Sequence, residues 1–508
     1  MFEASFFDRH SLINYQLFRA MKTLPQTTLS INALSRATGL SYSQTYTAFQ
    51  TVLVQLNQMI PAETIDEANF AQFLGNVTIN QYRFALLKES LPFVFFDDVF
   101  KKKNPHPDFH TFKEVHQTSV STLRRRITPF RDYLADNGVN LNSTTWAIEG
   151  DELHIRLAMF TFFMLAYRGA GWPFSAEEEK QAKTLLTVIN QTDPDFLLMP
   201  VEPMSKEALV VLAIQLMRIK QGHPLLPNRR MQLLFSGHED LPDLIFTSEQ
   251  FPNLSDSQLK AEKQFYYFMR LYFMTVTRQP QKIDRQLLTH FGETDNLVNR
   301  FVTGLVDHLN DQLKKTDRQP IAESQVMIAN LYRLSFNEYV LNGRFSQRLD
   351  FAQSLYDEAD SSTLATAIQR YLKQIPKSMP ESVFADFPDQ FISGLYLLVS
   401  DNYPELNHDM QMIVNVLIEH DSFAKRDLLD FLNDLGFIRV VPPVEAVKPD
   451  LIITSITKPK RVIPRLGHPF DPTTPLITWM PEPTDLDYFH LYQRLKQLQR
   501  QHRSTARS

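Results

Sequence analysis

The stretch SVSTLRRRITPFRDYL, residues Ser119–Leu134, decides how this chain is interpreted. Ser119 can begin a helix, because its hydroxyl is placed to accept a hydrogen bond from a backbone N–H of the first turn. Apolar residues then recur at spacings of 3, 4, 3 and 4, namely Val120, Leu123, Ile127, Phe130 and Leu134. One such stripe predicts a helix that packs on a core through a single face. Pro129 lacks an N–H and crowds the preceding turn, so we expect a kink or break there.

The opposite face of this helix carries hydroxyl and guanidinium groups. The residues predicted to contact DNA are Ser119, Ser121, Thr122, Arg124, Arg125 and Arg126. A helix N-terminus attracts a phosphate oxygen, and short hydroxyl side chains let the backbone approach closely. An arginine can bond guanine O6 and N7 with two donors. We therefore predict a recognition helix in which Arg125 contacts a base, while Arg124 and Arg126 grip phosphates.

The surroundings of this helix are basic in a chain that is acidic overall. The formal net charge is −5, and the isoelectric point is near 6.3. Between Val99 and Arg131 the local balance is 8 − 2 = +6. The basic residues are Lys101, Lys102, Lys103, Lys113, Arg124, Arg125, Arg126 and Arg131, and the acidic ones are Asp108 and Glu114. Lys113 joins the predicted DNA-binding surface, because local positive charge supplies affinity for phosphates.

A short hairpin is predicted directly after the helix. In VNLNSTTWAIEGD, residues 139–151, apolar and polar residues alternate on both sides of a polar tip at Asn142–Thr145. Alternation around a turn is typical of two short strands. We expect a wing whose Asn142 lies near a minor groove or phosphates. The alternative for the whole region is a solvated helix with a chance run of arginines.

An earlier segment, TLSINALSRATGLSYSQTY, residues 28–46, predicts another helix-turn-helix unit. Gly39 suits the tight turn, and Ser41 can cap the following helix. The outer face includes Tyr42 and Gln44, which are polar but uncharged. Direct DNA contact by Tyr42 and Gln44 is one interpretation, and a packing or dimerising role is the other.

The whole chain predicts a multidomain, mainly α-helical protein. We place a helix-turn-helix domain at residues 1–65, a winged helix-turn-helix domain at 66–170, helical bundles at 171–280 and 281–403, and a small α/β domain at 404–508. Helices in the bundles are predicted at 204–221, 255–278, 296–315 and 321–342. Strands at 411–419, 437–441, 451–456 and 476–480 alternate with helices at 423–435 and 485–499, which is typical of an α/β domain.

Three motifs resemble the Mga/AtxA family of Gram-positive transcriptional regulators. They are the SVSTLRRRI run, the segment Glu149–Arg156 with the sequence EGDELHIR, and the WPF of Trp172–Phe174. The resemblance implies that the two bundles are similar to phosphotransferase-system regulation domains (PRD-like), and that the last domain is similar to a sugar-transport IIB component. It also implies a DNA-binding activator of the bacterial cytoplasm, nucleoid-associated, which forms homodimers through its C-terminal half.

His223 lies in a Gly-His-Pro sequence after a predicted helix, near Arg218 and Lys220. Such a sequence is typical of a helix C-terminus. The family resemblance adds phosphorylation of His223 by a phosphocarrier protein, and both interpretations remain open. The chain has no cysteine, so the phosphocysteine of a IIB component is absent. His420 is a weaker candidate acceptor.

The composition excludes several kinds of site. Without cysteine there is no disulfide, thiolate metal site or cysteine nucleophile. His106, His110 and His116 lack the further ligands that a metal site needs. No phosphate-binding or nucleophile-elbow motif occurs, so we expect no cofactor, no metal and no enzymatic activity. The most apolar run, Leu157–Tyr167, is shorter than the roughly 20 residues of a membrane helix, and we expect neither a membrane contact nor a secretory signal. Alternative functions are a phosphotransfer protein, or an adaptor whose helix-turn-helix units bind protein.

Overall fold

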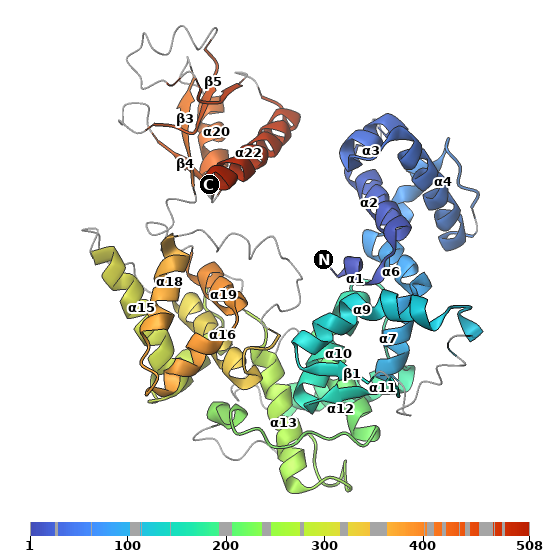
Figure 1. Cartoon of the computed structure of the whole chain (residues 1–508), viewed down its shortest axis with the longest axis vertical. Helices are drawn as coiled ribbons and strands as arrows, with labels where there is room; N and C mark the ends of the chain where they lie inside the picture. Colours follow the sequence, from blue (N-terminus) through green and yellow to red (C-terminus); the bar gives the residue numbers. More distant parts are fainter. Residues whose placement is uncertain are drawn as a thin grey trace. The chain divides into compact units, whose positions relative to one another are not determined.

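The computed structural model describes residues 2–506, except 26–28, 62, 102–111, 113, 143, 193–205, 236–244, 275–278, 315–323, 346–362, 401, 404–410, 419–422, 436, 442–447, 457–470, 472 and 480–482. The chain divides into two compact units. Unit 1 comprises Met1–Asn299, Ile328–Gln353 and Asp386–Phe391, and unit 2 comprises Arg300–Met327, Ser354–Ala385 and Ile392–Ser508. Helices predominate and strands are few and short, which confirms the predicted mainly α-helical class (Figure 1). In the ranges described, no helix is both long and apolar enough to cross a membrane.

Three helices near the N-terminus form the first helix-turn-helix unit, α2 (Arg9–Thr23), α3 (Ile31–Thr38) and α4 (Tyr42–Met59) (Figure 1). Gly39 ends α3 with φ 72°, a left-handed conformation that glycine adopts without strain. Ser41 then begins α4 in a reciprocal capping box with Gln44. The predicted glycine turn and serine cap are both confirmed.

The two helix-turn-helix units share packing contacts. Helix α6 (Ile79–Glu89) packs on α2, where the ring of Tyr82 stacks on that of Phe18 at 4.1 Å between centroids. The short helix α1 (Glu3–Phe6) packs instead on α7 (Leu91–Lys101) and α9 (Val120–Asp136). Along the chain, α5 (Phe70–Phe73) and the 3-10 turn η2 (Leu74–Asn76) lie between α4 and α6. The N-terminal residues therefore belong physically to the core beneath α9.

The predicted wing follows α9. Strands β1 (Val139–Leu141) and β2 (Ile148–Gly150) pair antiparallel, with Val139 opposite Gly150. Helix α10 (Glu152–Ala166) comes next and is buried on nearly every side, as its continuous apolar sequence requires. The Phe130 ring of α9 lies 4.9 Å from that of Phe6 and 4.8 Å from that of Phe96. This aromatic core fixes the inner face of α9.

Unit 1 continues through a set of packed helices. They are α11 (Ala176–Thr192), α12 (Lys206–Lys220), the 3-10 turn η3 (Met231–Phe235), α13 (Asp256–Leu271), α14 (Lys282–Gly292) and, from residue 328, α16 (Gln325–Leu341). Helix α12 is largely buried and packs on α10, α11 and α13. Helix α13 ends at Leu271, before the predicted end at residue 278. The helix ends where the next two residues, Tyr272 and Phe273, pack their rings against the ring of Phe160.

Unit 2 holds a smaller set of helices and the α/β domain. The helical part contains α15 (Leu297–Lys314, from Arg300 onward), α18 (Thr363–Gln374), the 3-10 turn η5 (Pro380–Asp386) and α19 (Asp389–Val399, from Ile392 onward). Phe301 of α15 lies 4.1 Å from Phe384 between ring centroids, and the Tyr371 hydroxyl donates to the Phe301 carbonyl at 3.0 Å. These contacts join α15 to α18 and η5.

The final part is the predicted α/β domain. Strands β3 (Met412–Leu417), β4 (Ile438–Val440), β5 (Leu451–Thr454) and β6 (Leu476–Thr478) form a parallel sheet in the order β4-β3-β5-β6. Helices α20 (Phe423–Asn433) and α22 (Asp485–Ala506) pack on one face of the sheet (Figure 1). Leu428 and Leu495 contribute to the core between that face and the helices. The predicted strands and helices of this domain are confirmed.

The predicted helices at 204–221, 296–315 and 321–342 correspond to α12, α15 and α16. The five domain boundaries, the PRD-like character of the bundles and the IIB-like character of the last domain remain predictions. His420, His106, His110 and Lys113 lie outside the described residues.

Candidate nucleic-acid interface

The N-terminus of α9 is capped by Ser119 as predicted. The Ser119 hydroxyl oxygen accepts from the Thr122 N–H at 3.1 Å and lies 2.9 Å from the hydroxyls of both Ser121 and Thr122. Leu123, Ile127, Phe130 and Leu134 are buried, and Val120 is half-buried. The apolar stripe is therefore confirmed, and it holds the first turn of α9 in a fixed orientation with three hydroxyl groups at its exposed end.

The opposite face of α9 is solvent-exposed and cationic. Ser121, Arg124, Arg125 and Arg126 are all exposed, and Thr122 is half-buried. Within the described part of the chain, the guanidinium groups of Arg124 and Arg125 form no ion pair or hydrogen bond. Both are thus available to an external anion.

Arg126 differs from its two neighbours. Its Nη2 lies 3.5 Å from Oδ2 of Asp8, the N-cap residue of α2, and each side chain is 40% exposed. Asp8 accepts the Ser11 N–H through its other carboxylate oxygen. Burial raises the pKa of Asp8, but the bonds from Ser11 and the charge of Arg126 outweigh it, so the pKa is lowered. Arg126 therefore partly neutralises an acid of the first helix-turn-helix unit, which the sequence did not indicate.

Pro129 lies inside α9, which runs unbroken from Val120 to Asp136. The break is therefore wrong, while the kink, the other expectation at Pro129, stays a prediction. Phe130 and Leu134 are buried beyond the proline, and their packing outweighs the lost backbone bond. Pro129 and Arg125 both lie on the exposed face, where water can bond the freed Arg125 carbonyl.

Asn142 shapes the tip of the wing. Its Oδ1 accepts from the N–H groups of Thr144 and Thr145, each at 2.9 Å, and its Nδ2 donates to Glu149 at 2.7 Å. Those bonds close the turn between β1 and β2. The Asn142 side chain is half-buried and engaged in the hairpin, and its contact with DNA remains a prediction.

The outer face of the first helix-turn-helix unit is apolar as well as polar. Tyr42 is 57% exposed at the start of α4. The Gln44 oxygen accepts from the Ser41 N–H at 3.2 Å and from its hydroxyl at 3.0 Å, so Gln44 serves the helix cap. The Tyr46 hydroxyl donates to Glu67 at 3.1 Å. DNA contact by Tyr42 and Gln44 stays a prediction.

His223 occupies the C-terminus of α12. Gly222 is left-handed with φ 81°, and the His223 N–H donates to the Arg218 carbonyl at 2.9 Å, which is the geometry of a glycine helix end. The imidazole is exposed. Burial of part of the ring and the nearby Arg218 lower its pKa, Glu152 opposes them, and Arg156 adds to the lowering. A lowered pKa favours the neutral ring at neutral pH, in which one nitrogen is unprotonated.

A charged cluster lies beside His223 and joins it to α10. Arg156 is fully buried; its Nη2 donates to the His223 carbonyl at 3.0 Å and its Nε to Glu152 at 2.9 Å. Arg218 binds Glu152 with two donors, at 2.9 and 2.7 Å. Sequence reasoning missed the cluster, although the Glu152–Arg156 spacing is that of a helical ion pair. Next to it lies a cavity of about 300 Å³ lined by Leu153, Leu225, Leu226, Arg229, Met231 and Gln264, among others.

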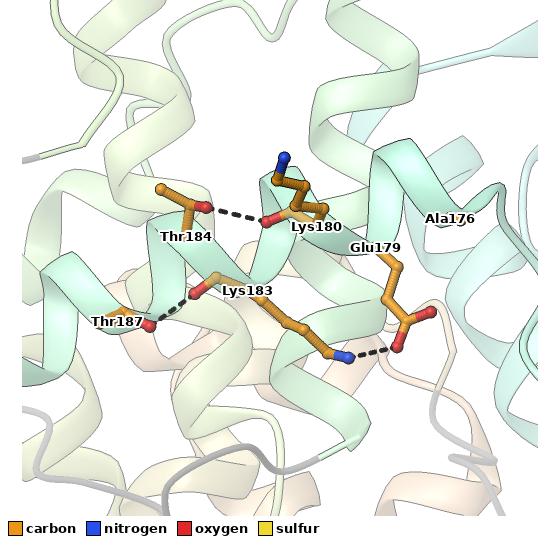
Figure 2. A pocket seen from close by; sticks show the side chains of 6 residues that line it. All are labelled: Ala176, Glu179, Lys180, Lys183, Thr184 and Thr187. Carbon is orange, nitrogen blue, oxygen red and sulfur yellow. Dashed lines mark hydrogen bonds and ion pairs between the residues drawn. The ribbon is translucent and has the colours of Figure 1, made fainter.

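A second hollow of about 340 Å³ lies on the surface of α11 (Figure 2). Lys183 pairs with Glu179 at 2.6 Å, and the Thr184 and Thr187 hydroxyls donate to the carbonyls of Lys180 and Lys183. Figure 2 shows these side chains along a single helix. The threonine hydroxyls are satisfied within the helix, so this surface offers basic charge rather than a catalytic arrangement.

Residues 75–163 match the family model of the Mga helix-turn-helix domain. The matched segment runs from η2 through α9 and the wing to near the end of α10. It contains the predicted contacts of α9 and the wing, while Tyr42, Gln44 and His223 lie outside it. No curated protein matches the chain. The resemblance drawn from the SVSTLRRRI run is thus supported, and the chain carries a helix-turn-helix domain of this regulator type.

Proposed function

We propose that this chain is a sequence-specific, DNA-binding transcriptional regulator and not an enzyme, with α9 as its recognition helix. The observation that supports the proposal best is the pair Arg124 and Arg125. Both are exposed on a capped helix whose other face is buried, and neither has a partner within the described residues. An unpaired guanidinium held on a rigid helix is suited to bonding phosphate or guanine with two donors.

The residues of α9 take different roles in this proposal. Arg125 lies opposite the apolar stripe and contacts a base edge in the major groove. Arg124 grips a phosphate, and the hydroxyls of Ser119 and Ser121 let a second phosphate reach the helix N-terminus. Arg126 contributes less than its neighbours, because Asp8 competes for it.

We further propose an activator that acts as a homodimer in the bacterial cytoplasm, at the nucleoid. Assembly through the C-terminal half is supported by α22, where Phe489 and Tyr492 expose large rings. Exposed aromatic side chains on a helix favour burial against a partner. Activation rather than repression rests on the resemblance to Mga-like regulators.

His223 is proposed as a phosphorylation site served by a phosphocarrier protein of the phosphotransferase system. Its exposed, neutral imidazole is the form that attacks a phosphoryl group. The product would carry about two negative charges beside Arg218 and would compete with Glu152 for that guanidinium. Label from the phosphorylated carrier should appear on the wild-type protein and vanish in His223→Ala; label retained in that variant would place the site elsewhere.

The experiment that tests the central proposal is selection from a random duplex library. Purified wild-type protein is expected to enrich one sequence motif over successive rounds. The variant Arg125→Ala should enrich a motif with at least one position relaxed, because a lost base contact costs about 1–3 kcal/mol of discrimination. Failure of the wild-type protein to enrich any motif would contradict sequence-specific binding.

A further inference from the structure

A tight turn after α16 reaches the base of the wing. It comprises Asn342, Gly343, Arg344 and Phe345, and is called the Arg344 turn below. Asn342, Gly343 and Phe345 have positive φ values of 54°, 72° and 57°. A side chain at Gly343 would meet Pro388 at 2.8 Å, so glycine is required there. A positive φ is strained for a residue as bulky as phenylalanine, and it persists only where the surroundings impose it.

Phe345 provides the apolar half of the contact. Its side chain is 2% exposed, and its ring centroid lies 6.5 Å from that of Tyr133 on α9 and 6.0 Å from that of His154 on α10. Its N–H donates to Oδ1 of Asn137, the C-cap residue of α9, at 2.6 Å. One residue therefore contacts both the recognition helix and the helix that follows the wing.

Arg344 provides the polar half. Its Nη1 lies 3.2 Å from Nδ1 of His154. A guanidinium only donates, so this contact is a hydrogen bond when Nδ1 accepts, which requires a neutral imidazole with its proton on Nε2. The same guanidinium covers Gly138, where φ is 75° and any Cβ would clash with Arg344. Gly138 joins the end of α9 to β1, so Arg344 lies over the hinge of the wing.

We infer that the Arg344 turn is a latch that sets the angle between the recognition helix and the wing. Arg344 and Phe345 are then positioning residues for DNA recognition, an inference that rests on the proposed function. The exposed face of α9 and the wing meet the same duplex, and such a site must be held within about 0.5 Å of its productive geometry. The latch comes from α16, which lies outside residues 75–163. It therefore couples α16 directly to the surface proposed to bind DNA.

Acid is expected to release the latch. The charged groups facing His154 in the described structure are Arg344 on the turn and Asp151 at the N-cap of its own helix. Burial lowers the pKa of His154 and Arg344 adds to the lowering, while Asp151 and a hydrogen bond with the Leu341 backbone oppose it. A protonated ring cannot accept from Arg344 and repels it. The latch is therefore closed at pH values above the ordinary histidine pKa. It opens as the pH falls through the lowered pKa of His154 in the folded chain.

The test compares Phe345→Ala with Phe246→Ala in the full chain. Phe246 is a matched control, because it is fully buried and has φ 53°, so the same side chain is removed from the same backbone conformation. The probes are a duplex selected by the wild-type protein and an unrelated duplex of equal length. Phe345→Ala should lower the affinity for the selected duplex at least about tenfold and leave the affinity for the unrelated duplex unchanged. In the free protein it should speed hydrogen exchange over residues 137–150, while Phe246→Ala leaves all readouts at wild-type values.

Arg344→Gln is the second variant. It tests the polar half of the latch, and it replaces Phe345→Ala if that variant folds poorly. In the wild-type protein, corrected hydrogen exchange over residues 137–150 should rise as the pH is lowered from about 7.5 to about 5.5. Arg344→Gln should exchange fast at both pH values. Wild-type exchange in both latch variants, or equal losses for both duplexes, would overturn the latch. If the wild-type protein selects no duplex, the proposed function fails, and the exchange data still decide the latch.

Discussion

Arg156 and Glu262 form a bidentate ion pair with both side chains fully excluded from solvent. Nη1 of Arg156 lies 2.6 Å from Oε2 of Glu262, and Nη2 lies 2.8 Å from Oε1. Arg156 belongs to α10 and Glu262 to α13, so the pair joins the helix after the wing to α13. Glu262 also accepts from the Leu225 N–H at 2.9 Å and from Gln215 at 2.9 Å. The pair is thus fully hydrogen-bonded, as a buried charge requires.

Removal of one partner from this pair should be strongly destabilising. Glu262→Ala leaves the Arg156 guanidinium buried with only Glu152 to balance it, and we expect the free energy of unfolding to fall by about 3 kcal/mol or more. Urea denaturation followed by circular dichroism measures the change. The control, Glu179→Ala, breaks the partly exposed pair with Lys183 and should cost less than about 1 kcal/mol. Similar losses of unfolding free energy in the two variants would mean that the buried pair stabilises the fold no more than a surface pair does.

Substitutions at Ser119 can separate two roles of this residue: capping α9, which affects stability, and leaving the helix N-terminus open to a phosphate, which affects duplex binding. Ser119→Ala should lower stability by about 1 kcal/mol, because the Thr122 N–H loses its acceptor. Ser119→Asn and Ser119→Asp both keep an acceptor and should retain the stability. Only Ser119→Asp places a negative charge where a phosphate would bind, so it alone of these two should weaken duplex binding in fluorescence anisotropy. Equal binding by both capped variants would remove the helix N-terminus from the interface.

Asp8 restrains Arg126, and Asp8→Asn should release it. The amide oxygen can still accept the Ser11 N–H, so stability should change by less than about 1 kcal/mol. A freed Arg126 can reach one more phosphate, which should steepen the slope of log affinity against log salt by about one. The pKa of Asp8 is lowered, so the carboxylate supports the fold above the ordinary aspartate pKa, and that support is lost as the pH falls through the lowered one. An unchanged salt slope in Asp8→Asn would place Arg126 away from the duplex.

His223 should contribute a pH dependence to stability. Its pKa is lowered in the folded chain, chiefly by burial and then by Arg218, so the unfolded chain takes up the proton more readily. The stabilising effect of the neutral ring is complete above the unfolded pKa of about 6.5 and is lost as the pH falls below it. The urea midpoint should therefore drop less between pH values of about 7.5 and 5.5 in His223→Gln than in the wild-type protein. An identical drop in both proteins would show that His223 does not titrate differently on folding.

Local signals in the sequence were enough to predict α9 and its surroundings. The Ser119 cap, the stripe ending at Leu134 and the Gly39 turn each depend on residues within a few positions of one another. The strands of the last domain were predictable for the same reason, since each is a short apolar run between turns. Each of these features is determined by residues only a few positions away in the sequence.

Long-range pairings left no comparable signal. Asp8 and Arg126 are 118 positions apart, and Asn137 and Phe345 are 208 apart, so no spacing rule connects them. Arg124 and Arg126 therefore looked equivalent in the sequence, although Arg126 is paired with Asp8 and Arg124 has no ion pair among the residues that the structure describes. The break expected at Pro129 failed likewise, because the packing of α9 against Phe6 and Phe96 was not visible in the local sequence.

The salt dependence of duplex binding in Arg124→Ala/Arg125→Ala tests the central claim most directly. Binding is measured by fluorescence anisotropy from about 50 to 200 mM salt, a range over which phosphate contacts dominate the slope. Lys180→Ala/Lys183→Ala on α11 removes the same formal charge from the surface in Figure 2 and serves as the control. If α9 is the recognition helix, the arginine variant loses most of its affinity and its slope falls by about one for each lost phosphate contact, while the lysine variant binds as the wild type does. Wild-type affinity and slope in the arginine variant would contradict that assignment.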